Sequence, residues 1–169
     1  MLNIFITNLG KYTEGTLQGE WVNLPATETE LEAVYERIGI NEEYEEMFIT
    51  DYETDIDGLS VGEYDSISDL NELAETWESM EEYEREIVEA MISEGYDLEE
   101  ALEKKDNCMI YYDCYDMEDV AREYVEETGL LHNVPEILQN YFDFEAYGRD
   151  MSYEGHFVFT NSGNCVQIY

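Results

Sequence analysis

The stretch NEEYEEMFITDYETD, residues 41–55, decides whether this chain folds, because it mixes acidic and apolar side chains so closely. Seven of its fifteen residues are Asp or Glu, yet it also holds two tyrosines, a methionine, a phenylalanine and an isoleucine. Acidic segments that stay unfolded lack aromatic and β-branched residues, since they have little surface to bury. The stretch therefore predicts a folded protein with a surface crowded with carboxylates, and its run EMFITDY predicts a strand.

The whole chain has the same character as this stretch. Its 169 residues include 43 Asp and Glu against 7 Lys and Arg, for a formal net charge of -36. Such a charge is typical of disordered chains, but aromatic residues make up 14% of the sequence and include 15 tyrosines. Because burial of those rings offsets the entropy lost on folding, we expect a folded protein of marginal stability.

The N-terminal and cysteine patterns indicate a cytoplasmic protein. The opening run MLNIFITNLG has no basic region before its apolar residues, so it does not read as a signal peptide. No apolar run approaches the ~20 residues that span a bilayer, and a surface this negative is repelled by anionic lipids. Three cysteines without paired spacing favour free thiols in a reducing compartment.

Residues 1–61 predict a small α+β unit with an antiparallel sheet and one helix. The runs LNIFIT and GEWVNLP predict two strands, and EMFITDY predicts the third. Between them, Thr27 and Glu30 form a capping-box pattern ahead of a helix that Gly39 would end.

Residues 62–105 predict a helical unit. Ser66 and Asp97 are expected to cap its first and third helices, and Ser79 with Glu82 is expected to form a capping box for the second. The second helix is dense in glutamate, with Arg85 as its one basic residue.

Residues 106–169 predict a C-terminal α+β unit. NCMIYYDC reads as a strand, Asp116 is expected to cap a helix, and VPEILQNYF reads as a helix with Pro135 in its first turn. The tail is expected to form a hairpin around NSGN. The whole chain is thus expected to be α+β, built from three small units.

Recognisable catalytic or metal-binding motifs are incomplete in this sequence. In DYETDIDG, Glu53, Asp55 and Asp57 match the first, third and fifth positions of a calcium loop, but Tyr64 stands where a bidentate Glu is required. GKYTEGT lacks the lysine spacing of a phosphate loop. Paired carboxylates carry no information among 43 acidic residues. We therefore expect no enzyme activity, no cofactor and no tight metal site.

The charge is then the strongest signal in the sequence. Two like charges ~5.5 Å apart cost roughly 0.7 kcal/mol even in water, so a lopsided surface opposes folding. A salt-loving source, a cation buffer and a protein that occupies a nucleic-acid-binding groove are the three explanations. The first does not explain so many large apolar residues, and the second needs better ligand spacing. The third needs fixed negative charge on a rigid, aromatic-rich frame.

Two segments of the sequence resemble the ArdA antirestriction family. IFITNLGKYTEGTLQGEWVNLP is similar to the family's opening, a strand followed by NLGKYNEG and a GxW segment that ends in Pro. DMEDVAREYVEETG followed by LLHNVPEILQNYFDFEAYGRDM is similar to the family's antirestriction motif region. The resemblance spans the chain and is weakest between residues 55 and 105.

The resemblance implies a function that composition alone does not. Members of the family are encoded on plasmids, transposons and phages, and inhibit type I restriction–modification enzymes by mimicking bent B-form DNA in the groove of the methyltransferase core. The family implies an elongated, curved homodimer of three-part chains, with the C-terminal part at the interface. Direct nucleic-acid binding is not expected. An acidic antagonist of another DNA-binding protein, such as a nucleoid protein or recombinase, is the alternative.

Two sets of site residues follow. The clusters expected to stand in for phosphates are Glu42, Glu43, Glu45, Glu46, Asp51, Glu53, Asp55, Asp57, Glu81, Glu82, Glu84, Glu86, Glu89, Asp116, Glu118, Asp119, Glu123, Glu126 and Glu127. The motif residues that match the family by position are Val134, Pro135, Tyr141, Phe142, Asp143, Ala146, Tyr147, Gly148, Arg149 and Asp150. Because aromatic side chains dominate core energetics, we expect packing rather than direct contact to be the main role of the motif. At one charge per ~1.7 Å, the net charge matches about 60 Å of duplex DNA.

Overall fold

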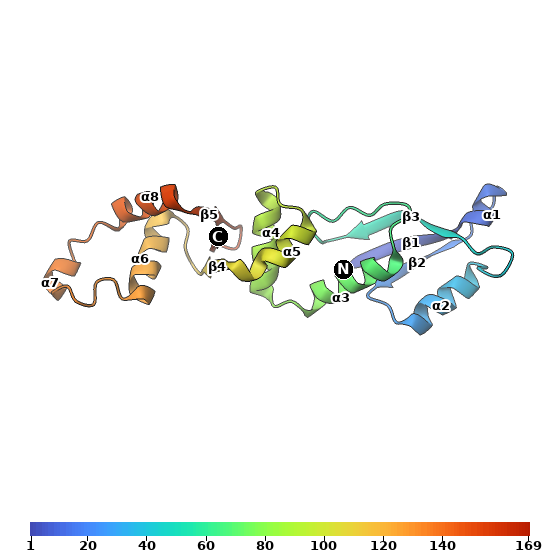
Figure 1. The fold of residues 1–169 in the computed structure, drawn as a ribbon, viewed down its shortest axis with the longest axis horizontal. Coiled ribbons are helices and arrows are strands. Elements are labelled where there is room, and N and C mark those ends of the chain that lie inside the picture. Colours follow the sequence, from blue (N-terminus) through green and yellow to red (C-terminus); the bar gives the residue numbers. More distant parts are fainter. The chain divides into compact units, whose positions relative to one another are not determined.

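The computed structural model describes residues 1–169 and has a mixed α+β fold with two small antiparallel sheets (Figure 1). The chain forms two compact units, Met1–Met80 and Glu81–Tyr169. The first contains β1 (Leu2–Asn8), α1 (Leu9–Thr13), β2 (Gly19–Leu24), α2 (Glu28–Arg37), β3 (Met47–Thr54) and α3 (Ile67–Ser79). The second contains α4 (Glu82–Ser93), α5 (Leu98–Lys104), the 3-10 helix η1 (Lys105–Asn107), β4 (Cys108–Tyr111), α6 (Met117–Thr128), α7 (Glu136–Gln139), α8 (Phe144–Glu154), β5 (His156–Phe159) and β6 (Cys165–Ile168).

The N-terminal sheet has β1 as its central strand, paired antiparallel with both β2 and β3. Its alternate residues Leu2, Ile4 and Ile6 are fully buried, as the two-residue period of a half-buried strand requires. Helix α2 contacts β2, and its Val34 is buried together with Ile38, which follows it. One face of the sheet and one face of the helix therefore form the core of this unit.

Asn8 joins the end of β1 to the end of α2. The side chain is fully buried, and its Oδ1 accepts a hydrogen bond of 3.0 Å from the Lys11 N–H, which caps α1. Its Nδ2 donates to the carbonyls of Ile38 and Gly39 at 3.2 and 3.1 Å. All of its polar atoms are used, so its burial is not penalised.

Helix α3 belongs with the N-terminal unit. It contacts β2, and Oδ1 of its Asn71 accepts a 2.7 Å hydrogen bond from the N–H of Ala26, which lies just after that strand. Leu70, Ala74 and Trp77 are buried along one side of the helix. These contacts fix α3 to the loop between β2 and α2.

The C-terminal sheet has β6 at its centre, between β4 and β5, with α4 against one face and α6 and α8 against the other. Cys108 of β4 faces α4, where its Sγ lies 3.7 Å from the Sδ of Met91. The opposite face of the sheet carries Tyr111 and Cys165, which form a buried cluster with Val120 of α6. Both faces of this short sheet are thus covered by helices.

The expected α+β class is confirmed, and so are the strands and caps predicted around both sheets. The capping box expected at Ser79 and Glu82 is wrong, because α3 continues through Ser79 and the box lies at Glu81 and Glu84. The helix expected over VPEILQNYF is also shorter than predicted. Only the four residues of α7 are helical, and none of them is buried, so packing does not extend the helix.

The contacts group α3 with the first unit and α4 and α5 with the second. The helices of residues 62–105 are therefore shared between the two units: α3 contacts β2, whereas α4 contacts β4 and β6 and carries α5. The division into three domains at 1–61, 62–105 and 106–169 stays a prediction. No helix in the structure is both long enough and apolar enough to cross a membrane.

Candidate functional site

The first acidic cluster is a tight turn between α2 and β3. Oδ1 of Asn41 accepts hydrogen bonds from the backbone N–H groups of Glu43 and Tyr44 at 2.8 and 3.2 Å, which shapes the turn. The ring centroid of Tyr44 lies 3.8 Å from the Lys11 ammonium, and a side-chain hydrogen bond with Tyr44 raises the pKa of Lys11. The turn leaves four carboxylates exposed: Glu42, Glu43, Glu45 and Glu46.

The second cluster follows β3 and the turn after it. Asp51 and Glu53 are exposed and two residues apart, so they lie on the same face of the strand. Asp51 is paired in register with Phe5, whose ring packs edge-to-face on Trp21 with centroids 5.3 Å apart. The outer face of the N-terminal sheet therefore presents carboxylates beside aromatic rings. Asp55 and Asp57, just beyond, are also exposed.

The third cluster lies on α4, where five predicted carboxylates divide into two kinds. Glu81, Glu82 and Glu89 are exposed. Glu84 is half-buried against Lys105, and that hydrogen bond lowers its pKa.

Glu86 of α4 is held by the turn of the β5–β6 hairpin. Burial alone would raise its pKa, but hydrogen bonds from Ser162, Thr160 and Asn164 outweigh burial and lower it. The Asn164 amide donates to Oε2 of Glu86 at 2.9 Å. This carboxylate is charged and anchors the hairpin to α4.

The fourth cluster is on α6. Oδ1 of Asp116 caps the helix by accepting from the N–H groups of Glu118 and Asp119 at 2.9 and 3.0 Å. The side chain of Glu118 pairs with Arg122 one turn later, and Asp119 accepts from the Tyr115 N–H. Further along the helix the exposed carboxylates are Glu123, Glu126 and Glu127.

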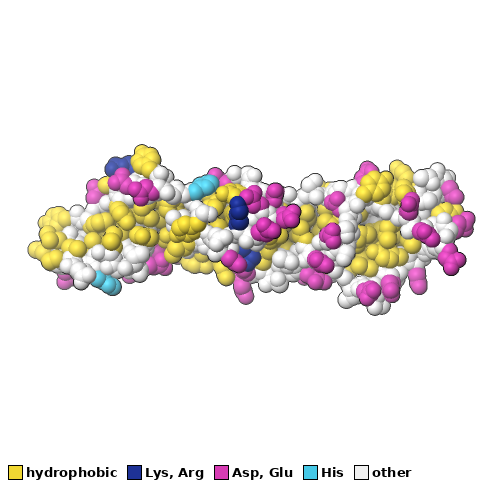
Figure 2. Space-filling view, viewed as in Figure 1, with side chains coloured by type: hydrophobic (Ala, Val, Ile, Leu, Met, Phe, Trp, Pro, Cys, Tyr) yellow, Lys and Arg dark blue, Asp and Glu magenta, His cyan; other side chains and the backbone are white.

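Of the nineteen predicted carboxylates, fifteen are exposed and four are half-buried. The half-buried four are Glu84, Glu86, Glu118 and Asp119. Figure 2 shows one face of the molecule, where Asp and Glu side chains far outnumber those of Lys and Arg. The acidic side chains are thus mainly at the surface, as a binding role requires.

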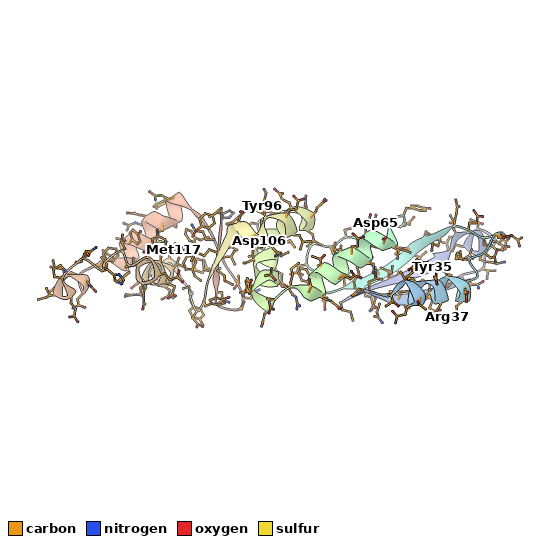
Figure 3. The ribbon with its side chains drawn as sticks, turned by 60° about the horizontal axis from the view of Figure 1, so that its bottom comes forward. Tyr35, Arg37, Asp65, Tyr96, Asp106 and Met117 are labelled. Atoms are coloured by element: carbon orange, nitrogen blue, oxygen red, sulfur yellow. The ribbon has the colours of Figure 1, made fainter.

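Most of the basic side chains pair with carboxylates other than these fifteen. Arg37, labelled on α2 in Figure 3, forms a bidentate pair with Glu20 and lowers the pKa of that carboxylate. Six of the seven Lys and Arg residues form ion pairs with carboxylates outside the fifteen, namely Glu14, Glu20, Glu84, Glu100, Asp106, Glu118 and Asp150. The N-terminal ammonium pairs with Asp55, and most of the negative charge of the exposed clusters is retained.

The aromatic residues of the antirestriction motif pack on one another. The ring centroid of Phe142 is 4.9 Å from that of Phe144 and 5.5 Å from that of Tyr147, in both cases edge-to-face. The ring of Tyr147 also lies 6.4 Å from that of Tyr124 on α6. These contacts hold α8 against α6.

Gly148 and Asp143 have specific structural tasks in the motif. A Cβ at Gly148 would lie 2.1 Å from the carbonyl oxygen of Met117, so only glycine permits α8 to approach α6 so closely. Oδ1 of Asp143 caps α8 by accepting from the N–H of Ala146 at 2.9 Å. At the other end, Arg149 and Asp150 are exposed.

The region before the motif exposes apolar side chains. Leu130, Ile137 and Leu138 are 51%, 72% and 55% exposed, and Tyr141 is 82% exposed. Hydrophobic atoms gather in Figure 2 where Figure 1 places α7 and α8. Val134 is half-buried and Pro135 is exposed at the start of α7. These residues form an apolar surface, named here the α7 surface.

Two features of the site lay outside the sequence predictions. Helix α8 was not expected, although Asp143 three residues before Ala146 is a recognisable cap signal. Tyr83 and Tyr112 were not expected at the site either. They line one cavity, but α4 and β4 are far apart in the sequence, so no local pattern predicts it. No group of three or more His, Cys, Asp or Glu side chains is arranged to hold a metal ion.

One comparison with known proteins gives a match over nearly the whole chain. A family model described as "Antirestriction protein (ArdA)" matches residues 4–166, which include all four acidic clusters and most of both sheets. No curated protein matches the chain.

Proposed function

This chain belongs to the ArdA antirestriction family, and from that premise we propose that it inhibits type I restriction–modification enzymes by occupying their DNA-binding groove. In this role it would protect an incoming mobile element in the cytoplasm of a bacterial host. It would act by binding alone, without catalysis and without a cofactor.

The observation that carries the proposal is the exposed acidic surface on a folded frame. Fifteen carboxylates in four clusters are exposed, and six of the seven Lys and Arg side chains pair with other carboxylates. A DNA-binding groove presents Lys and Arg to a row of phosphates. Carboxylates fixed on a strand and on two helices can meet those groups as phosphates do, with electrostatic steering of the encounter.

The half-buried carboxylates have another role in the proposal. Glu86 and Glu84 are held by the hairpin and by Lys105, and Glu118 and Asp119 are held within the N-terminal turn of α6. They position the surface, whereas the exposed fifteen present charge to the enzyme. The antirestriction motif supports the same surface by packing α8 on α6.

The α7 surface supports the proposal of a homodimer. Monomeric proteins rarely expose several large apolar side chains side by side, and Leu130, Ile137, Leu138 and Tyr141 are more than half exposed. Since residues near the antirestriction motif carry few carboxylates compared with α4 and α6, self-association there avoids like-charge repulsion. Dimerisation would also double the number of acidic clusters that face one enzyme.

The direct test is DNA cleavage by a purified type I enzyme, with and without the purified protein. The proposal predicts dose-dependent loss of cleavage, and no loss with a type II enzyme on the same DNA. Undiminished cleavage at a large molar excess of the protein would refute it.

A pair of matched variants tests whether the placement of charge matters. One variant replaces Glu43, Glu45 and Glu46 by Gln, and the control replaces three exposed glutamates of α2, Glu28, Glu32 and Glu36. At roughly 0.5 kcal/mol per charge, the first variant should bind the enzyme about tenfold more weakly. The control carries the same change in net charge, and equal weakening by both would mean that net charge alone drives binding.

A further inference from the structure

A cavity of about 640 Å³ opens between α4, the residue that follows β4 and the turn of the β5–β6 hairpin. Its acidic lining is Glu81, Glu82, Glu86 and Glu89, and Arg85 is the one basic residue in it. At neutral pH the lining carries a formal net charge of -3. The cavity is therefore a concave, negatively charged site, within the size range of ligand pockets.

Two aromatic side chains also line this cavity. Tyr83 comes from α4 and Tyr112 follows β4, and they are 45% and 57% exposed. No aromatic partner is found for either ring among the ring pairs of the structure. Aromatic faces beside carboxylates attract cations, because the ring quadrupole adds to the Coulomb attraction.

The cavity is built on fixed elements rather than on a loose loop. Glu86 accepts hydrogen bonds from the Ser162 hydroxyl and the Asn164 amide, and both of these residues line the cavity. Glu84, also on α4 but outside the lining of the cavity, is paired with Lys105. Because Glu86, Ser162 and Asn164 are held before binding, this part of the wall loses little conformational entropy when a side chain enters.

We propose that this cavity receives an arginine side chain of the enzyme that the protein inhibits, with the guanidinium between Tyr83 and Tyr112 and against Glu81 or Glu82. The inference rests on the proposed function, which supplies a basic protein surface as the partner. Charge complementarity selects that partner: a negative cavity on a protein of net charge -36 repels anionic ligands and phosphate backbones.

Arginine fits the site better than lysine does. A planar guanidinium stacks on aromatic rings and forms paired hydrogen bonds with a carboxylate, whereas an ammonium is a compact and strongly hydrated charge. Phosphates of DNA offer no aromatic face to the same arginine. This cavity would then give the inhibitor a contact that the DNA it displaces does not make.

The test is NMR titration of the full chain, labelled on its tyrosine rings, with the peptide acetyl-Gly-Arg-Gly-amide. Matched peptides carry lysine, or the neutral isostere citrulline, in place of arginine. We expect saturable shifts of the Tyr83 and Tyr112 rings, stronger for arginine than for lysine and absent for citrulline. Tyr83→Phe and Tyr112→Phe assign the signals and should retain binding.

Removal of either ring should weaken binding. Tyr83→Leu and Tyr112→Leu are expected to bind the arginine peptide about fivefold more weakly, as loss of one cation–π contact implies. Tyr153→Leu is the control, since Tyr153 is 80% exposed on α8 and does not line the cavity. Spectra of the two sheets verify that each variant is folded.

The outcomes separate this inference from the proposed function. Equal shifts for arginine and lysine, or shifts spread over all the acidic clusters, would overturn the arginine site even if DNA cleavage is still inhibited. Specific binding of the arginine peptide without inhibition of the enzyme would support the site and overturn the proposed function instead.

Discussion

Replacement of Gly148 by alanine should destabilise the C-terminal unit through one backbone contact. The added Cβ would lie 2.1 Å from the carbonyl oxygen of Met117 and 2.6 Å from its carbonyl carbon. Ordinary contact begins at about 3.4 Å, so α8 must move away from α6 by more than about 1 Å. The backbone of Met117 cannot rotate aside as a side chain can.

The size of the effect follows from two opposing contributions. Overpacking of a well-packed interior costs about 1–3 kcal/mol, and a rigid backbone neighbour favours the upper end of that range. Alanine is the better helix former by about 1 kcal/mol. We therefore expect Gly148→Ala to lower the free energy of unfolding of this unit by about 2 kcal/mol.

Hydrogen exchange measures this loss locally, which matters because the two units of the chain need not unfold together. The most protected amides of α6 and α8 should exchange about 30-fold faster, while those of β1 should not change. Ser152→Ala, at an exposed position of α8, is the control and should have little effect. Unchanged protection of α6 and α8 in Gly148→Ala would refute the packing role of the motif glycine.

Three further predictions concern charge and thiol chemistry. Glu86→Gln should loosen the hairpin turn at residues 160–164; since the pKa of Glu86 is lowered from 4.5, its carboxylate stabilises the fold above about pH 4.5. The destabilisation should thus be largest near neutral pH and shrink as the pH falls through the folded pKa, and a pH-independent difference in urea unfolding would contradict this. The melting temperature should rise when NaCl is increased from 20 to 500 mM, because salt screens the repulsion of a -36 charge. KCl should raise the melting temperature by the same amount. No rise would mean that the charges do not oppose folding. Burial raises the pKa of Cys114 to about 11 and that of Cys165 to about 12. Cys108, which is only half-buried, should therefore react first with a disulfide reagent at pH 8. Equal reaction rates of the three thiols would contradict the structure.

Local signals in the sequence predicted most of the elements. The two-residue period of LNIFIT and the cap pairs at Thr27 and Asp116 depend on neighbouring residues alone, and the structure has the strand and both helices. The box misplaced at Ser79 shows the limit of such signals. Glu81 is the N-cap of α4, and the residue before it, Met80, is buried in an extended conformation that depends on the tertiary fold.

The candidate site was predictable in composition but not in detail. The positions of the acidic clusters follow from the sequence, and fifteen of nineteen carboxylates are exposed. The structural use of Glu86 was not predictable, because its partners lie more than seventy residues away in the chain. The same holds for Lys105, which neutralises Glu84 across 21 positions.

Packing also explains why the motif could be matched but not interpreted from sequence. NYFDFEAYGRD contains the aromatic residues and the glycine that join α8 to α6, yet the partners Tyr124 and Met117 lie outside it. When the residues that a motif contacts are distant in sequence, the motif alone does not indicate what it does. The structure supplies those contacts.

Competition between DNA and this protein for one groove is the most direct test of the proposed mechanism. The measurement is equilibrium binding of the protein to the methyltransferase core of a type I enzyme, with increasing amounts of a duplex that contains its target site, at two salt concentrations. Mimicry of DNA predicts mutually exclusive binding and an affinity that falls as salt rises. A ternary complex of enzyme, duplex and protein, with an affinity indifferent to salt, would contradict it.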